Sequence, residues 1–405
     1  MRAMRLLSGA ADDASLAHDV AAVGVADAVV VMMDSSGREL TRVRDASVPP
    51  GVPPQPDQVI RNLTRPALQR ALYAALPPGT VVCGAAFAAA KPLPDGRVEV
   101  RFEAAAAGEA PPEAAVVDVL VGADGIRSSV RSQLEKMGAP PRRPVYSGYR
   151  YYRGLVDLEK LGGADAWVAS LGGTNNRIIY GASETCMLYQ VSPTHASFAR
   201  YCPAPEGSSR GVSPAEAKQH LMELCKGYPY PAPQMAEALE GGAIHLGELW
   251  SMPPSEEVWG AGCITLAGDA AHAVLPTLGQ GAGQGVEDAV TLAITLHRAA
   301  ASKAAAASGG GGAANAACRL SPAEVEAALR QYEAERGPHV QRVYHFSTSA
   351  FRSGVGESWL GRLRRNWQYR LMPAWLMKKA TAWLTECTFA WDEAPPAAAA
   401  VAATA

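Results

Sequence analysis

The densest set of chemically useful residues lies between Cys263 and Ala293 of this 405-residue chain. The apolar stretch Cys263–Ala267 predicts a strand, and Gly268-Asp269 follows it directly. A carboxylate is thereby placed at the carboxyl edge of a sheet, where open α/β sheets bind their ligands. The pattern predicts a binding site with Asp269 at its rim.

Glycine recurs at every second position in the run Gly279–Gly285. Glycine lacks the side chain that would keep backbone amides away from a flat ring. A helix predicted over about Gln280–Arg298 would point its N-terminus at negative charge developing on that ring. A purely structural glycine-rich loop is the alternative. His272 precedes the run, and we interpret it as bracing the loop in preference to a catalytic role.

A second segment, residues 116–134, predicts a strand over 116–121, a tight turn through Asp124-Gly125 and a helix from about Arg127. A strand that turns sharply into a helix directs backbone N–H groups at one point, which suits an anion such as a pyrophosphate. Asp124 would bond a ribose or ribityl hydroxyl, or it would simply cap the turn. The residues leave both roles open.

Composition excludes several classes of protein. Lys and Arg number 37 against 39 Asp and Glu, and this net charge of −2 argues against a nucleic-acid binder. Seven scattered cysteines without a CxxC pair predict neither a disulfide framework nor a metal site. No apolar run approaches the roughly 20 residues of a membrane span, and no signal peptide is evident, so a soluble intracellular protein is expected. The GxSxG match at 207–211 lacks the strand that a nucleophile elbow needs.

Periodicity predicts the elements that position these segments. Helices are expected over Arg61–Leu76, Pro214–Leu224 and Pro322–Arg336, the latter two with serine N-caps. Short strands are expected at 81–82 and 98–102. Residues 46–58 predict a loop, and the Ala/Gly-rich stretch 299–318 predicts a flexible surface insertion.

Both segments resemble fingerprints of FAD-dependent monooxygenases of the aromatic-hydroxylase type, the family of p-hydroxybenzoate hydroxylase, salicylate hydroxylase and zeaxanthin epoxidase. VGADGIRSSVR resembles the fingerprint associated with FAD and NAD(P)H, and GDAAHAVLPTLGQGAGQGVEDA resembles the one whose Asp binds the FAD ribityl chain. Three further stretches agree in order: TRPALQRAL with the helix whose Arg faces FAD, YSGYRYYRGLV with the strand entering the substrate domain, and YEAERGPHV with the first C-terminal helix. The resemblance covers residues 1–391.

The resemblance implies an enzyme in which NADPH or NADH reduces FAD and O₂ adds to form a flavin C4a-hydroperoxide. The distal oxygen then hydroxylates or epoxidises an electron-rich aromatic or polyene substrate. No protein nucleophile is needed, and no catalytic residue is assigned beyond the flavin-facing loop of Pro276, Leu278 and Gly279. The implied cofactor-binding residues are Arg65, Asp124, Gly125, Gly268, Asp269, Pro276, Gly279, Gln280 and Gly281.

The sequence departs from the family at its start, because it contains no GxGxxG. By comparison with the family, one N-terminal βαβ unit is expected to be absent. A flavin-free, catalytically inactive truncated homologue that acts as an interaction module is therefore the alternative function. Another flavoenzyme, such as a reductase or halogenase, ranks lower because Glu287-Asp288 and GYRYYRG resemble the hydroxylase branch.

The expected fold is α/β (α+β): an FAD-binding doubly wound sheet without its first βαβ unit, an inserted mainly β substrate domain, and C-terminal helices. The predicted division is 1–145 for the first part of the FAD-binding domain, 146–255 for the substrate domain, 256–300 for the second FAD-binding part, 301–320 for a low-complexity loop, 321–391 for C-terminal helices and 392–405 for a disordered tail. Tyr149, Tyr151, Tyr152 and Tyr189 would line an aromatic substrate site or, as we favour, pack within the sheet.

The C-terminal segment carries tryptophan at every eighth position from Trp359 to Trp391, with arginines and lysines between. Eight residues advance a helix by about 80° beyond whole turns, so these tryptophans would wind around it. Packing against the flavin domain is the favoured interpretation. A weak contact with a membrane surface is the alternative.

Overall fold

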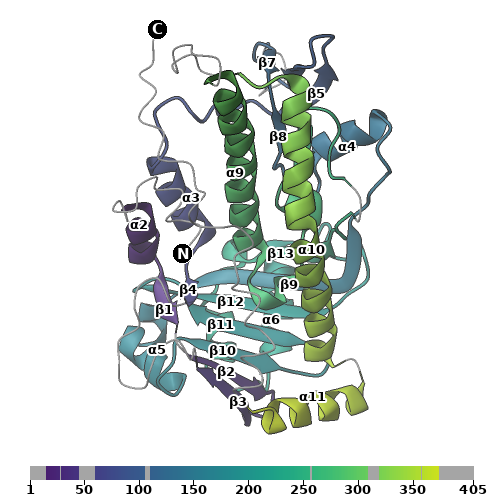
Figure 1. Ribbon diagram of the computed structural model, residues 1–405. Coiled ribbons are helices and arrows are strands. Elements are labelled where there is room, and N and C mark those ends of the chain that lie inside the picture. The colour runs from purple at the N-terminus through teal and green to yellow at the C-terminus, as the bar shows by residue number, and fades with distance from the viewer. Residues whose placement is uncertain are drawn as a thin grey trace.

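The computed structural model describes residues 15–27, 29–44, 60–104, 110–255, 258–308, 319–356 and 358–373 (Figure 1). It confirms the mixed α/β class. The predicted loop at 46–58 lies outside the described residues, as does everything after residue 373.

A seven-stranded sheet forms the lower half of the molecule in Figure 1, in the order β13-β9-β12-β11-β10-β2-β3. All neighbours are antiparallel except β2 and β10. The strands are β2 (Val29–Asp34), β3 (Glu39–Arg44), β9 (Val145–Asp157), β10 (Asn176–Tyr180), β11 (Thr185–Gln190), β12 (His195–Pro203) and β13 (His245–Ser251). Two of these strands, β2 and β3, come from the segment 1–145 that the sequence assigns to the FAD-binding domain, so the sheet joins them to strands of the predicted substrate domain 146–255. The rest of the predicted division stays a prediction.

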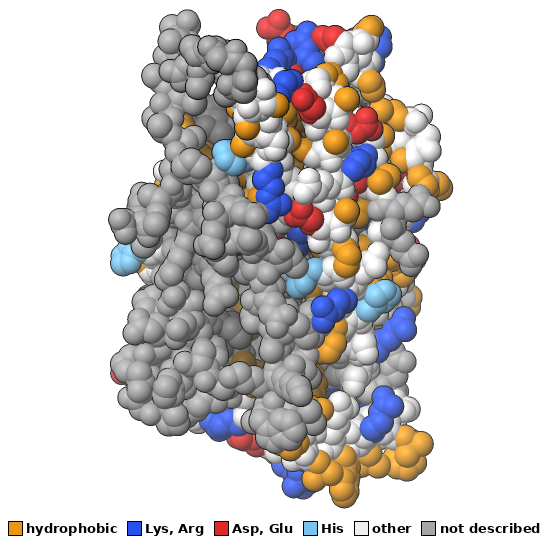
Figure 2. Space-filling model, in the orientation of Figure 1, with side chains coloured by type: hydrophobic (Ala, Val, Ile, Leu, Met, Phe, Trp, Pro, Cys, Tyr) orange, Lys and Arg blue, Asp and Glu red, His pale blue; other side chains and the backbone are white. Residues whose placement is uncertain are grey.

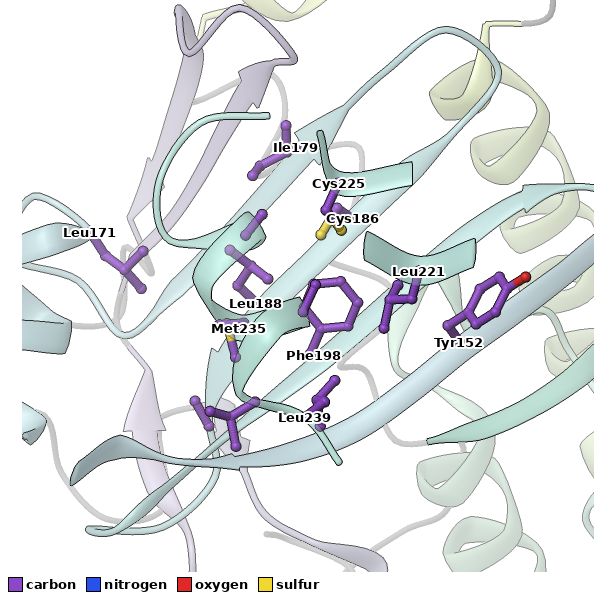
Figure 3. Close-up of a cluster of buried hydrophobic side chains, with 14 of the residues drawn as sticks. Tyr152, Leu171, Ile179, Cys186, Leu188, Phe198, Leu221, Cys225, Met235 and Leu239 are labelled. Carbon is purple, nitrogen blue, oxygen red and sulfur yellow. The ribbon is translucent and has the colours of Figure 1, made fainter. Parts of the chain in front are cut away.

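One face of this sheet builds the largest core. Tyr152, Phe198 and Leu188 point from β9, β12 and β11 toward Leu221 and Met235 (Figure 3). All five side chains are fully buried. The covering elements are α5 (Ala164–Ser170), α6 (Pro214–Cys225), α7 (Ala232–Ala238) and the 3₁₀ turns η1 (Leu158–Leu161) and η2 (Gly241–Ala243). Helix α6 begins as predicted, with Ser213 and Glu216 forming a capping box.

The predicted strand 116–121 is two strands in two sheets, because the chain turns at Asp118. β7 (Ala115–Val117) closes an antiparallel sheet with β5 (Phe87–Pro92) and β6 (Val98–Phe102). β8 (Leu120–Gly122) instead pairs in parallel with β14 (Ile264–Leu266), and α4 (Ser129–Lys136) follows it. Apolar residues run on both sides of Asp118, so the sequence pattern alone does not reveal the break. The predicted strand at 81–82 is wrong: these residues lie in a loop, and Val82 is exposed.

Two long helices, α9 (Gly281–Ser308) and α10 (Pro322–Val355), pack side by side above the sheet (Figure 1). Helix α10 begins at the predicted Ser321 capping box but does not end at Arg336. It continues through Pro338, because the side chains of Val340, Val343 and Phe351 beyond the proline are buried and hold the helix against the rest of the protein. Helix α9 runs into the predicted loop 301–320 as far as Ser308, where alanine-rich sequence favours helix.

The remaining elements cover the start of α9 and the foot of the molecule. α2 (Ser15–Val23) and α3 (Arg65–Ala74) meet Val286 of α9 in a small apolar cluster, beside the strand pair β1 (Val25–Asp27) and β4 (Ile60–Asn62). α11 (Trp359–Leu371) lies across the lower end of α10 (Figure 1). Among the described residues, no helix combines the length and apolarity that a bilayer crossing requires.

The core under the sheet is a direct test of this architecture. Truncating Phe198 to alanine should lower the free energy of unfolding by about 3–5 kcal/mol, since a fully buried ring leaves a cavity. The matched control, Leu155→Ala on the neighbouring strand, removes a side chain that is 47% exposed and should cost well under half as much. Chemical denaturation measures both. Equal losses in the two variants would contradict the core assignment.

Candidate functional site

The turn after β14 lies directly on the start of α9. Gly268 adopts φ 58° and ψ −140°, a conformation that side-chain-bearing residues rarely tolerate. A Cβ built on Gly268 would lie 3.7 Å from the Cα of Gly285, so the two backbones pass in near contact. Asp269 then begins the short helix α8 (Asp269–His272). Glycine at both positions is what permits the turn to approach the helix.

A buried carboxylate fixes this arrangement. Asp288, which is 0% exposed, accepts hydrogen bonds from the backbone N–H of Gly268 (2.7 Å) and from Nε2 of His272 (2.6 Å). Its other oxygen accepts from Nε of Arg336 on α10 (2.8 Å). Burial raises the pKa of Asp288, but the interactions with His272 and Arg336 outweigh it and hold that pKa below its usual value. Asp288 thus joins the turn, α9 and α10 as an anion.

Arg336 is the cation at the centre of the same network. It is 0% exposed and donates through Nη1 to Oε2 of Glu287 (2.6 Å) and through Nη2 to Oε1 of Gln284 (2.7 Å). The proximity of Glu287 and Asp288 raises its pKa in spite of burial. The sequence analysis singled out Glu287-Asp288 but gave Arg336 no role. No local pattern singles it out, because the predicted helix Pro322–Arg336 also contains Arg330.

Two further arginines hold the carbonyls of α8. Arg131 of α4 donates to the carbonyl oxygen of Ala270 (2.8 Å), and Arg142 donates to that of Ala271 (2.5 Å). Burial lowers the pKa of Arg142 to about 10, which still leaves the guanidinium charged at neutral pH. Sequence reasoning missed both. Through Arg131 the second signature segment is tied to the turn at Gly268-Asp269.

The loop predicted to face a ring is presented by a 3₁₀ turn. η3 (Pro276–Leu278) ends at Gly279 with φ 63°, and α9 begins two residues later at Gly281. Ser347 of α10 donates to the carbonyl of Leu275 (2.7 Å) and anchors the base of the turn. The buried hydroxyl of Thr277 finds no hydrogen-bond partner among the described residues. A buried polar group without a partner is unusual and is consistent with a ligand group lying against this turn.

Asp269 faces outward from the same corner. Its side chain is exposed, and its carboxylate forms no hydrogen bond or ion pair with any other described residue. A Cβ built on Gly281 would lie 4.0 Å from its Oδ1, so the carboxylate lies beside the N-terminus of α9. An unpaired acceptor, backbone amides and a helix N-terminus therefore meet here. These groups fit a ligand with hydroxyls and an anionic ring edge, as FAD has.

The other predicted cofactor residues make contacts of different kinds. Asp124 accepts from the backbone N–H of Ser129 (2.7 Å) and of Val130 (3.2 Å), so it caps α4, which is one of the two roles left open. Gly125 has φ 79°, as a tight turn requires. Arg65 is exposed at the first position of α3, and Gln280 accepts the backbone N–H of Gln284 within the first turn of α9. The cofactor roles of all the residues named from the sequence, Asp269 included, stay predictions.

His272 braces the loop. It is 2% exposed, bonded to Asp288, and lies with its ring centroid 5.2 Å from that of Trp259. No group of three or more His, Cys, Asp or Glu side chains among the residues described is arranged to hold a metal ion.

The sheet face below η3 carries an aromatic cluster. Tyr149, Tyr201 and Leu249 pack there with Leu275 and Phe351, and the rings of Tyr149 and Phe351 meet edge-to-face at 4.9 Å. Tyr151 packs against this cluster. Tyr152, in contrast, points to the opposite face and belongs to the core of Figure 3, as the packing interpretation expected.

Comparisons with known proteins agree with this geometry. A family model described as "FAD binding domain" matches residues 97–308, just over half of the chain. Aurachin C monooxygenase/isomerase from Stigmatella aurantiaca is 32% identical over 242 residues, which are 60% of this chain and 52% of that protein. Chloroplastic zeaxanthin epoxidase from Solanum lycopersicum is 28% identical over 60% of this chain and 32% of its own length. The chain thus spans about half or less of these curated relatives.

Solved structures share the fold. HpxO from Klebsiella pneumoniae, in complex with FAD and uric acid, aligns over 94% of this chain and 84% of its own with a TM-score of 0.71 and 20% identity. A salicylate hydroxylase substrate complex aligns over 98% and 90%, with a TM-score of 0.68 and 18% identity. The family model covers more than half of the chain and therefore shows its class, that of proteins with an FAD-binding domain. The chain belongs to the FAD-binding domain family of aromatic-hydroxylase-type monooxygenases.

The buried network predicts a large effect of one conservative change. Asp288→Asn keeps the shape but leaves Arg336 without its full counter-charge, so the free energy of unfolding should fall by about 3–5 kcal/mol. The control Glu113→Gln, at an exposed position, should change it by less than about 0.5 kcal/mol. Urea denaturation at pH 7 measures both. A loss below about 1 kcal/mol for Asp288→Asn would contradict the network's role.

His339, one turn beyond Arg336, makes stability depend on pH. Burial and the neighbouring Arg336 and Arg342 lower its pKa from 6.5 to about 4, although Asp288 opposes this. The unfolded chain therefore takes up the proton first, and stability falls as pH drops from about 6.5 to 4, by at most about 1.4 kcal/mol per pH unit. In His339→Gln this part of the slope should vanish. Denaturation of both proteins between pH 7 and 5 compares the two slopes, and identical slopes would contradict the assignment.

Proposed function

We propose that this chain binds FAD at the corner between β14 and α9 and acts as an FAD-dependent monooxygenase. NADPH or NADH is its proposed reductant, O₂ its oxidant, and a small electron-rich organic compound its substrate. The observation that carries the proposal is the exposed carboxylate of Asp269, which has no partner among the described residues and lies beside the N-terminus of α9. Family membership supports it independently.

The chain's own groups would divide the work of holding the cofactor. Asp269 would accept hydrogen bonds from ribityl hydroxyls. The backbone amides from Leu278 to Gly281 and the N-terminus of α9 would stabilise negative charge on the pyrimidine edge of the flavin. Pro276 would form the wall beside the ring. Arg65, Asp124 and Gly125 would contribute to the remainder of the dinucleotide.

FAD, when bound and reduced, supplies the chemistry that activates O₂. The protein's part is to position substrate and exclude water. Tyr149, Tyr201 and Phe351 pack with Leu275, just before the η3 turn, and would form an apolar floor beneath a flat substrate. These rings carry few polar atoms, so the floor favours apolar or aromatic compounds such as those named for the relatives.

The first test is binding. The purified chain is mixed with FAD, passed through gel filtration, and its visible spectrum is recorded. A retained, perturbed flavin spectrum supports the proposal, and NADPH and NADH oxidation with candidate substrates then follows. A folded chain that retains no flavin favours the alternative, a flavin-free homologue that acts as an interaction module.

The residue-level prediction concerns Asp269. Asp269→Ala should weaken FAD binding about 10- to 100-fold, which corresponds to the loss of one or two hydrogen bonds to a charged acceptor. Because the carboxylate is exposed and unpaired, the thermal midpoint without FAD should stay unchanged. Glu113→Ala, a second exposed carboxylate, is the control. Titration followed by flavin fluorescence measures the affinities, and an unchanged value for Asp269→Ala would place the ribityl contact elsewhere.

A further inference from the structure

Helix α11 presents a different kind of surface from the corner between β14 and α9 at which we propose that FAD binds (the flavin corner). It is 13 residues long, begins at an N-cap where Ser358 accepts the backbone N–H of Gly361 (3.0 Å), and packs against β3 and the end of α10. The described chain ends two residues beyond it, at Pro373. Its position at the foot of the molecule leaves one long side facing away from the protein (Figure 1).

The inward side of α11 is held by polar and aromatic contacts. Arg365, which is 2% exposed, donates to the carbonyl oxygens of Gly354 (2.8 Å) and Gly181 (3.2 Å). Its guanidinium lies 5.1 Å from the ring centroid of Tyr180, and Tyr369 stacks on that ring with centroids 5.4 Å apart. The helix therefore docks on the protein through Arg365 and Tyr369.

The outward side is apolar, the reverse of an ordinary surface helix. At about 100° per residue, five large exposed side chains fall within an arc of about 120°. These are Trp359, Leu360, Leu363, Trp367 and Leu371, whose exposed fractions are 62%, 61%, 47%, 64% and 66%. Figure 2 shows hydrophobic side chains gathered at this lower edge of the molecule.

This finding corrects the favoured interpretation of the tryptophans. Trp359 and Trp367 do not pack against the flavin domain. The two tryptophans lie about 80° apart around the helix axis, as their spacing of eight residues predicts. Leu360, Leu363 and Leu371 fall between and beside them and complete one apolar stripe. Trp375, Trp383 and Trp391 lie outside the described residues.

The charges around the stripe identify what would cover it. Arg364 is exposed at one edge of the stripe, Arg370 is exposed within its arc near Trp359, and the helix contains no acidic residue. Apolar residues with tryptophan, flanked by arginine, form the pattern of helices that lie in the headgroup region of a bilayer. Indole rings favour that interface, and arginine side chains reach lipid phosphates from it.

A second copy of the chain fits less well. A two-fold contact through this stripe would bring Arg364 and Arg370 of both copies together without acidic partners. Stable interfaces also involve about 20–30 residues on each side, whereas the stripe offers five large side chains. We propose that α11 docks the protein on the surface of an anionic membrane, with its apolar stripe at the level of the lipid headgroups.

Sedimentation with lipid vesicles tests this on the full chain. The wild type should bind vesicles of phosphatidylcholine with phosphatidylserine several-fold better than vesicles of phosphatidylcholine alone, and salt should weaken the difference. Trp359→Gln/Trp367→Gln should lower the partition coefficient at least ten-fold. Tyr73→Gln, at an aromatic residue that is 62% exposed on α3, should leave it unchanged.

Charge is tested separately from the apolar stripe. Arg364→Glu/Arg370→Glu should abolish the preference for phosphatidylserine. The control Arg210→Glu, at an exposed position distant from α11 in the sequence, should keep it. All variants alter exposed side chains, so their circular dichroism and thermal midpoints should match the wild type. Equal partition of wild type and both α11 variants would overturn the proposal. So would a concentration-dependent dimer, seen by light scattering, that the tryptophan variant alone loses.

Discussion

The structure around the candidate site depends on one buried charge, the carboxylate of Asp288. A charged group that is 0% exposed must recover in hydrogen bonds and counter-charge the hydration that it has lost. Here the donors are Gly268 and His272, at the two ends of the short helix after β14, and Arg336 of α10, while Asp288 itself belongs to α9. Satisfying the charge therefore fixes the turn after β14, the start of α9 and the middle of α10 relative to one another.

The arginines around the site donate to acceptors inside the protein and not to Asp269. Arg131 and Arg142 take the carbonyls of α8, and Arg336 takes the acids inside α9. Asp269, one residue from these contacts, has none of them and faces outward. Asp288 and Arg336 are paired in the interior, so Asp269 at the corner beside α9 keeps a carboxylate without a partner among the described residues.

Local signals in the sequence predicted what is determined locally. The capping boxes at Ser213 and Ser321 and the segment from Gly268 to Gly285 required only neighbours a few residues away. The failures have a long-range cause. Arg336 meets Asp288 across 48 positions, and Arg131 meets Ala270 across 139, so no spacing rule identifies either pair. The break at Asp118 and the passage of α10 through Pro338 likewise follow from packing partners that are distant in sequence.

Helix α10 connects the three surfaces that the molecule presents. Its first half carries Arg336 and holds the corner beside α9, and its second half places Phe351 in the aromatic cluster below η3. Its last turn offers the carbonyl of Gly354 to Arg365, which seats α11. Because a packed helix is stiff over such lengths, the orientation of α11 at a lipid surface would also set the orientation of the aromatic floor and of the flavin corner. A single rigid element thus relates where the protein would dock to where its substrate would lie.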